Sequence, residues 1–302
     1  MLSAGRLFAQ DRPAFSTAVK VVNVFATVRD GRGAIVRNLT KDDFILEEDG
    51  RPQVIRYFAQ ESELPLSVGL LIDTSGSTRL VRPEERLAGY RFLQQVMREG
   101  RDLAFIVHFD YETRVLQDLT SQRRLLENAL VKMELSLQRR QPRPAPGFIP
   151  GGGTVLFDAV SQSAFEIMRK QSGRKALIVL SDGMDRGSRQ TLGEAVEAVQ
   201  RSDALLYSIL FVDPHTLVRG WDKGLHVMRS LAGDTGGQCF DATGRMPLEK
   251  AFSIIEEDLR SQYSLGYTPD AARTGRGYRK IRLTVKGKGF SVRTRKGYYP
   301  EL

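Results

Sequence analysis

The hydrophobic pattern of residues 63–262 alternates between short apolar runs and longer amphipathic stretches. The run Leu66–Ile72 is continuous and bounded by polar residues, as in a strand that is buried on both faces. The stretch at 83–98 places apolar side chains at helical spacing and predicts an amphipathic helix. Strands that alternate with helices in this way indicate a parallel sheet with helices on both faces. The expected strands are 66–72, 103–109, 113–116, 175–181, 204–211 and 238–241, and the expected helices are 83–98, 122–137, 155–169, 189–201, 223–233 and 247–262.

The N-terminal segment, residues 18–62, has the pattern of β-strands instead. Val19–Val28 is rich in valine, which favours strands. Further along, Phe44–Glu48 and Gln53–Phe58 flank Asp49-Gly50, a dipeptide that strongly favours a hairpin turn. So few strands do not form a stable unit by themselves. We therefore expect them to pack with strands from elsewhere in the chain.

The C-terminal segment, residues 263–302, predicts the missing strands. Tyr263–Tyr267 comes first and is followed by two stretches in which apolar and polar residues alternate, at 278–286 and 290–296. Gly287-Lys288-Gly289 between these stretches predicts that they form a hairpin.

Together these patterns predict an insertion. The expected fold class is α/β, in which a doubly wound, mainly parallel six-stranded sheet at 63–262 is inserted in a small β-sandwich formed by 18–62 and 263–302. Residues 1–17 show no periodicity. Leu7–Asp11 is compatible with the last residues of a signal peptide, but no charged start and long apolar centre precede it. A disordered terminus and a remnant of an export signal both stay open.

The charge is concentrated at the C-terminal end. The net charge is +9, and residues 263–302 alone hold 10 Lys and Arg against 2 Asp and Glu. Such a surplus suits nucleic acid or anionic lipid head groups, or a solvated strand face that protects a sheet edge from aggregation. We favour the solvated face, for which Arg279, Arg282 and Arg293 are the residues to test, and consider nucleic acid an unlikely partner. The single cysteine, Cys239, excludes an internal disulfide, and no apolar run approaches the ~20 residues of a membrane-spanning helix.

The candidate chemistry lies where the first buried run ends. Asp73, Ser75 and Ser77 offer oxygen donors from one tight loop, and Gly76 eases the bend. Ligands bind at the carboxyl ends of the strands in an open parallel sheet. Hard cations such as Mg²⁺ prefer oxygen ligands and keep several waters. A short Asp/Ser pattern also occurs in turns that cap a helix, so this loop alone leaves both interpretations open.

Two further segments complete a pattern. Gly151–Ala159 is a glycine loop that presents a threonine at the start of an expected helix, and Ala176–Gly183 is a second buried strand that ends in an aspartate. Together with the loop that begins at Asp73, these segments resemble the metal-ion-dependent adhesion site of von Willebrand factor type A domains. The resemblance implies that the strands carrying the two aspartates are neighbours where the strand order reverses. It implies ligand roles for Asp73, Ser75, Ser77, Thr154 and Asp182.

By the same resemblance, the cation is Mg²⁺ (or Mn²⁺ or Ca²⁺). A vacant coordination position then accepts a carboxylate from an exposed acidic residue of a partner protein. This implies a protein-binding module for adhesion or scaffolding, and not an enzyme. Two alternatives stay open: an assembly factor that works with an AAA-type ATPase, as other bacterial members of the family do, and an enzyme of unknown class.

Five further segments, Leu39–Phe44, Glu48–Gln53, Ser181–Asp185, Gln262–Tyr267 and Arg295–Tyr298, carry a narrower resemblance that covers about residues 18 to 299. The chain is similar there to a bacterial group called VWFA-related domain proteins, often seen in acidobacteria. Members of that group are typically exported, and usually begin with a signal peptide. A full signal peptide is not present in this chain, so export to the periplasm or the outside is expected from the resemblance alone.

Other motifs match less well. Asp234-Thr235-Gly236 has the aspartic-protease triplet, but no second copy appears, and that chemistry needs paired carboxylates. Neither a Gly-x-Ser-x-Gly elbow nor a phosphate-binding Gly-x-x-x-x-Gly-Lys loop occurs. We expect Asp158 to stabilise the start of its own helix and Asp185 to be a loop carboxylate, with no role as metal ligands.

Overall fold

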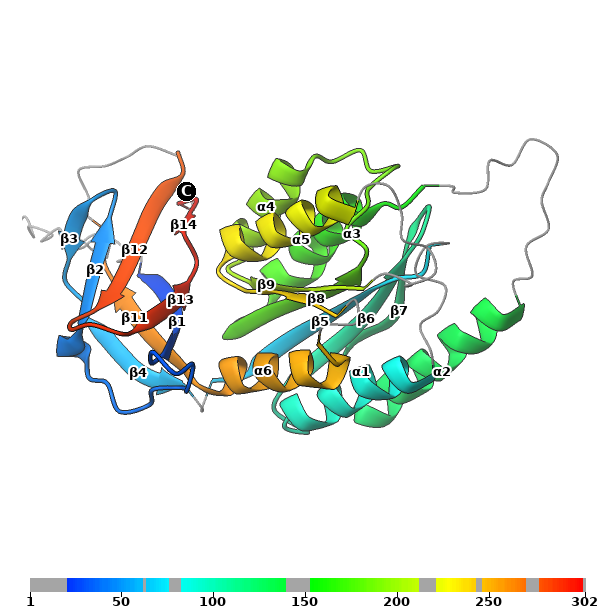
Figure 1. Ribbon diagram of the computed structural model, residues 1–302, viewed down its shortest axis with the longest axis horizontal. Helices are drawn as coiled ribbons and strands as arrows, with labels where there is room; N and C mark the ends of the chain where they lie inside the picture. The colour runs from blue at the N-terminus through cyan, green and yellow to red at the C-terminus, as the bar shows by residue number, and fades with distance from the viewer. Residues whose placement is uncertain are drawn as a thin grey trace, which may run out of the picture.

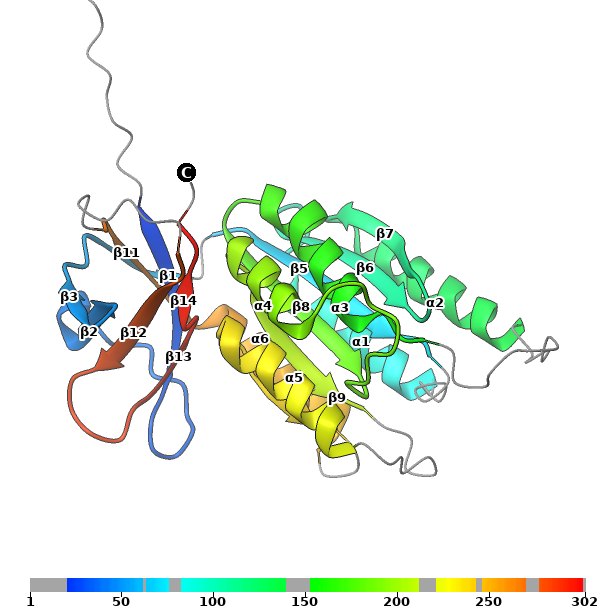
Figure 2. The same ribbon diagram turned by 90° about the horizontal axis from the view of Figure 1, so that it is seen from above.

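The computed structural model describes residues 21–61, 64–75, 83–139, 153–211, 221–242, 246–269 and 277–300. They form two parts that lie side by side, an α/β part and a part made of antiparallel sheets (Figure 1, Figure 2). The predicted fold class is confirmed, because a mixed six-stranded sheet with helices is accompanied by additional antiparallel sheets. The domain boundaries at 62/63 and 262/263 stay a prediction, and residues 1–17 lie outside the described part of the chain.

The six-stranded sheet consists of β5 (Leu66–Asp73), β6 (Leu103–Phe109), β7 (Thr113–Thr120), β8 (Arg174–Ser181), β9 (Leu205–Leu210) and β10 (Cys239–Asp241). The strand order is β10-β9-β8-β5-β6-β7, and only the pair of β6 and β7 is antiparallel. Every residue of β5 is buried, as its continuous apolar run predicts, because β5 lies near the centre of the sheet with helices on both faces.

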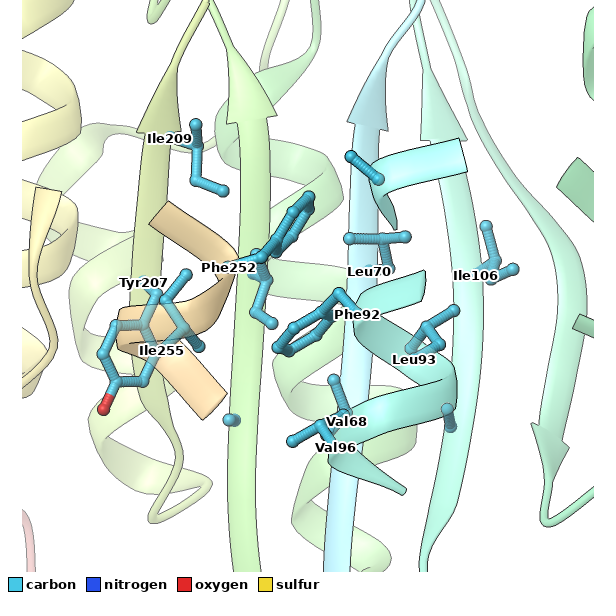
Figure 3. Close-up of a cluster of buried hydrophobic side chains, with 14 of the residues drawn as sticks. Val68, Leu70, Phe92, Leu93, Val96, Ile106, Tyr207, Ile209, Phe252 and Ile255 are labelled. Atoms are coloured by element: carbon cyan, nitrogen blue, oxygen red, sulfur yellow. The ribbon is translucent and has the colours of Figure 1, made fainter. Parts of the chain in front are cut away.

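Helices cover both faces of this sheet. On one face lie α1 (Pro83–Val96), α2 (Arg123–Arg139) and α6 (Leu248–Arg260), and on the other lie α3 (Leu156–Gln162), α4 (Leu192–Arg201) and α5 (Trp221–Thr235) (Figure 1). On the first face, Phe92 of α1 and Phe252 of α6 stack with ring centroids 4.7 Å apart, in one buried cluster with Val68 and Leu70 of β5 (Figure 3). Among the described helices, none is long and apolar enough to span a membrane.

Two expected helices differ in detail from the structure. The helix expected at 155–169 is divided, because α3 continues into a π-helical turn, Ser163–Ile167, and a 3-10 turn, Met168–Lys170. The helix expected at 189–201 begins only at Leu192, because Thr191 caps it. The Thr191 Oγ1 accepts the amide of Glu194 at 3.3 Å, and the Glu194 carboxylate accepts the amide of Thr191 at 2.8 Å.

The strands from the two ends of the chain are β1 (Val22–Arg29), β2 (Phe44–Glu48), β3 (Arg51–Gln53), β4 (Tyr57–Glu61), β11 (Gln262–Tyr267), β12 (Arg279–Val285), β13 (Ser291–Thr294) and β14 (Gly297–Tyr298). They form two sheets with the orders β13-β1-β11-β4 and β14-β12-β2-β3. Each sheet combines strands from both ends of the chain, and the two sheets share one buried cluster that includes Val24, Leu46, Tyr263 and Leu283. The expected β-sandwich of N-terminal and C-terminal segments is therefore present.

One expected hairpin forms, with Arg51–Gln53 as its second strand in place of the expected Gln53–Phe58, and the other does not form. β2 and β3 pair around Asp49 and Gly50, whose φ values of 49° and 78° are those that a tight hairpin turn requires. The prediction that 278–286 pairs with 290–296 is wrong: β12 pairs with β2 and β14, whereas β13 pairs with β1 in the other sheet. The alternation of apolar residues indicates which face of a strand is buried, but it does not select the neighbouring strand.

The basic C-terminal segment is only partly solvated. The Arg282 side chain is 76% exposed and lies 3.6 Å from Glu47. Arg279 is instead buried beside Glu48, and Arg293 pairs with the fully buried Asp258. The prediction of a solvated face is therefore wrong for Arg279 and Arg293, because their carboxylate partners come from distant parts of the chain.

Candidate metal site

The candidate site lies where the strand order of the central sheet reverses. From β5 the chain continues to β6 on one side, and it later returns to β8 on the other side of β5. The connection after β5 leads to α1 on one face, and the connection after β8 leads to α4 on the opposite face. The carboxyl ends of β5 and β8 therefore flank a topological switch point, where ligands bind in such sheets. Asp73 ends β5, and Asp182 directly follows β8.

Asp73 is held on both of its carboxylate oxygens. Its Oδ1 accepts the amide of Ser75 at 2.9 Å, and its Oδ2 accepts the hydroxyl of Ser181 at 2.6 Å. Burial raises the pKa of Asp73 to about 6, and the nearby Asp182 carboxylate adds to this increase, whereas the hydrogen bonds from Ser181 and Ser75 oppose it. A bound cation would stabilise the charged form of this buried carboxylate.

Ser181 is a site residue that the sequence analysis missed. It is fully buried, and besides donating to Asp73 its Oγ accepts the amide of Gly183 at 3.0 Å. Gly183 has a φ of 76°, and a Cβ there would lie 2.3 Å from the carbonyl oxygen of Gly224, so only glycine fits this turn. The available signal was a hydroxyl residue directly before the aspartate that ends the second buried strand.

Asp182 places a second carboxylate near Asp73. The residue is 5% exposed, and its Oδ1 accepts the amide of Met184 at 2.9 Å. No hydrogen bond to its Oδ2 is made from the described part of the chain. A carboxylate oxygen that accepts no hydrogen bond from the described residues is a favourable ligand for a cation.

Thr154 is tied to the loops after both β6 and β8. Its carbonyl oxygen accepts the amide of Arg186 at 2.9 Å, and the amide of Val155 donates to the carbonyl of Asp110 at 2.8 Å. Asp110 follows Phe109, which is the register partner of Asp73. The segments that carry Asp73, Thr154 and Asp182 therefore meet at one edge of the sheet.

Four of the five predicted ligands are described by the structure, and each is buried at this edge. Asp73, Ser75, Thr154 and Asp182 are between 1% and 5% exposed, whereas Ser77 lies outside the described residues. In the described ranges, no group of three or more His, Cys, Asp or Glu side chains is placed to hold a metal ion. The four described candidates are two carboxylates and two hydroxyl residues, and such a set of oxygen donors fits a hard cation. The assignment of the five ligands stays a prediction.

Asp158 lies in the first turn of its own helix, as expected for a carboxylate that stabilises the helix start. Its carboxylate also accepts hydrogen bonds from the amides of Arg189 and Gln190 in the loop after β8, which the sequence analysis did not foresee. The start of α3 is held in addition by Asp185, whose Oδ1 accepts a hydrogen bond from the amide of Phe157 at 3.2 Å. Sequence proximity indicates the local role, whereas only folding brings the two segments together.

Comparisons with known proteins concern the fold. No protein-family model matches the sequence, and no curated protein matches it. Similar solved structures include the conserved hypothetical protein BatB from Bacteroides thetaiotaomicron, with 16% identity, a TM-score of 0.45 and coverage of 64% of this chain and 97% of that chain. The vWF domain of the type V pili tip protein Mfa5 from Porphyromonas gingivalis has 14% identity, a TM-score of 0.47 and coverage of 64% and 94%.

A third similar structure is proximal thread matrix protein 1 from the mussel byssus, described with a zinc-occupied MIDAS motif. It has 10% identity, a TM-score of 0.46 and coverage of 70% of this chain and 49% of that chain. The chain thus spans about half the length of this protein. At these identities and scores, the similarities assign neither a family nor a site to this chain.

Proposed function

We propose that this chain is a protein-binding module that depends on a divalent cation. In this proposal Mg²⁺, or Mn²⁺ or Ca²⁺ in its place, is held by Asp73, Ser75, Ser77, Thr154 and Asp182. The cation accepts a carboxylate from an exposed acidic residue of a partner protein, and the chain carries out no reaction. The resemblance to an exported bacterial group is the basis for placing this activity outside the cytoplasm.

The observation that carries the proposal is the position of Asp73 beside Asp182 at the switch point. Two carboxylates close together in a buried place repel each other, and a divalent cation between them removes that repulsion. The pKa of Asp73, raised to about 6 by burial and by Asp182, supports this argument.

The mixture of ligands supports the binding of a partner. Ser75, Ser77 and Thr154 are uncharged ligands. The only anionic ligands are therefore the two aspartates, whose summed charge equals that of the cation and does not exceed it. A cation with few anionic ligands keeps its attraction for an external carboxylate. Because both oxygens of Asp73 already accept hydrogen bonds, we propose that the hydroxyl of Ser75 contacts the cation directly and that Asp73 acts through water.

Calorimetric titration with Mg²⁺ and Mn²⁺ tests the cation site. The wild-type chain should bind the cation, and Asp73→Ala should lose this binding while circular dichroism shows retained folding. Asp42→Ala is the matched control, because Asp42 is an exposed aspartate in the antiparallel-sheet part and should not affect binding. A wild-type chain that binds no divalent cation would overturn the proposal.

A pull-down in Mg²⁺ and in chelator tests the partner. Proteins that bind in Mg²⁺ should be released by the chelator and should not bind Asp73→Ala. Replacement of the acidic residues that the partner exposes at its contact should abolish binding. A partner that binds equally well in chelator would contradict the dependence on a cation.

A further inference from the structure

Two segments on the proposed cation site are joined by a reciprocal set of hydrogen bonds. The first segment is 154–158, at the start of α3, and the second is 182–190, the loop after β8. From the first segment, the carboxylate of Asp158 accepts two amides of the second. Its Oδ1 lies 3.0 Å from the amide of Arg189 and 2.9 Å from that of Gln190, and its Oδ2 lies 3.1 Å from the amide of Arg189.

Residues of the second segment in turn accept hydrogen bonds from amides of the first. The Asp185 Oδ1 accepts the amide of Phe157 at 3.2 Å, and the Ser188 hydroxyl accepts the amide of Asp158 at 3.1 Å. Asp185 also accepts the hydroxyl of Ser188 at 2.6 Å, which holds the two acceptors together. The residue that precedes α3, Val155, makes no side-chain cap of its own. The amides of Phe157 and Asp158 in the first turn of α3 are therefore satisfied from the loop that carries Asp182.

The two backbones also approach each other closely. The amide of Arg186 donates to the carbonyl of Thr154 at 2.9 Å. A Cβ placed on Gly153 would lie 3.6 Å from the Cα of Gly187, and one placed on Gly187 would lie 3.4 Å from a methyl carbon of Val155. The hydrogen bonds of Asp158, Asp185 and Ser188 thus join the same two segments whose backbones approach each other here.

We propose that Asp158, Asp185 and Ser188 are positioning residues that fix Thr154 relative to Asp182 before a cation binds. This inference rests on the proposed function. Mg²⁺ requires near-ideal octahedral geometry, so a site whose ligands lie on two independent loops must order both loops when the cation arrives. We call the hydrogen bonds of Asp158, Asp185 and Ser188 between the two segments the interlock. The interlock joins the two loops into one unit and thereby removes that ordering cost.

The test compares two acidic residues that both accept backbone amides beside a helix start. Asp158→Ala removes the interlock acceptor, and the affinity for Mg²⁺ in calorimetry should fall by about tenfold or more, as for other residues that orient metal ligands. Asp158→Asn keeps one carbonyl acceptor and should recover part of the affinity. Glu194→Ala is the control, because the exposed Glu194 accepts the amide of Thr191 at the start of α4 and makes no hydrogen bond to the segments of Thr154 and Asp182. It should lower the melting temperature and leave the Mg²⁺ affinity unchanged.

Amide hydrogen exchange tests the interlock in the absence of a cation. In chelator, amide hydrogen exchange of Arg189 and Gln190 should be faster in Asp158→Ala than in the wild type, and the increase should extend to the amides of segment 154–158. Ser188→Ala, which removes one acceptor and one donor, gives the same comparison with a smaller disturbance if Asp158→Ala does not fold.

The outcomes separate the two proposals. A wild-type chain that binds no Mg²⁺ overturns the proposed function and this inference with it. If the wild type binds Mg²⁺ and Asp158→Ala binds it with equal affinity, as Glu194→Ala should, the interlock does not position the site. The inference is then overturned while the proposed function stands.

Discussion

Asp258 of α6 and Arg29 of β1 form an ion pair with 2.6 Å between the carboxylate Oδ1 and the guanidinium, although 229 positions separate them in the chain. The Asp258 side chain is fully buried, and its Oδ2 pairs with Arg293 of β13. A helix of the α/β part is thus held by strands from both ends of the chain.

Asp258→Asn should lower the free energy of unfolding by about 2–4 kcal/mol, because it leaves two partly buried guanidinium groups without their shared carboxylate. Glu257→Gln is the control: Glu257 pairs with the same Arg29 but is 43% exposed, so its loss should cost less than about 1 kcal/mol. Urea denaturation of the two variants and the wild type measures both changes in the free energy of unfolding. Equal effects of the two substitutions would contradict a special role for the buried carboxylate.

Glu48 joins the two antiparallel sheets. Its Oε1 accepts a hydrogen bond from the guanidinium of Arg279 of β12 at 3.2 Å. Its Oε2 accepts hydrogen bonds from the hydroxyls of Tyr267 of β11 and Tyr298 of β14. All four side chains are buried. Glu48→Gln should cost about 3–5 kcal/mol, because Arg279 then stays buried without a countercharge.

The neighbouring Glu47 provides the comparison for Glu48. It lies 3.6 Å from Arg282, whose side chain is 76% exposed, so Glu47→Gln should change the free energy of unfolding by less than about 1 kcal/mol. Thermal and urea denaturation of both variants measure the difference. A Glu48→Gln variant as stable as Glu47→Gln would show that the buried network contributes little.

Asp102 should make stability depend on pH. It is 1% exposed and accepts the amides of Leu66 and Arg98 and the guanidinium of Arg98. Burial by itself raises the pKa of this carboxyl, but the hydrogen bonds from Arg98 and Leu66 outweigh it, and the net pKa is lowered. A lowered folded pKa stabilises the protein above the unfolded value, about 3.9, and this contribution is lost as the pH falls through the folded pKa.

Asp102→Asn should therefore lower the free energy of unfolding by about 1–3 kcal/mol near neutral pH. The difference from the wild type should narrow below about pH 4, where the wild-type carboxyl begins to take up a proton. Denaturant titrations on both sides of that pH measure this change. A difference that is the same at both pH values would exclude the ionised carboxylate as its source.

Ser181→Ala should weaken cation binding without unfolding the protein. It removes the hydroxyl that orients the Asp73 Oδ2, and the loss of such a supporting contact should reduce Mg²⁺ affinity by about tenfold. Ser208→Ala is the control, because Ser208 is an equally buried serine in the next strand, β9, whose hydroxyl donates to the carbonyl of Met228. Calorimetry should show reduced affinity only for Ser181→Ala, and equal affinities would remove Ser181 from the site.

Features that depend on local patterns could be predicted from the amino-acid sequence. The continuous apolar run before Asp73 predicts a central buried strand, and the structure has β5 there. The second run before Asp182 predicts another buried strand, β8, whereas its place beside β5 was implied only by the family resemblance. The Asp49-Gly50 turn was predictable because few residues adopt a positive φ. Thr154 could be placed only through the family resemblance, because a glycine loop has no periodicity of its own.

The pairing of distant groups, in contrast, depends on how the chain folds. Arg293 was expected to be solvated, but it pairs with Asp258. Asp158 lies in the first turn of its own helix as expected, but its carboxylate also accepts hydrogen bonds from the amides of Arg189 and Gln190 in a distant loop. A local pattern indicates how a residue is oriented relative to the core. The partner that a buried charge or an unpaired amide finds depends on how the strands and helices pack, because desolvation makes such a group costly until folding supplies its partner.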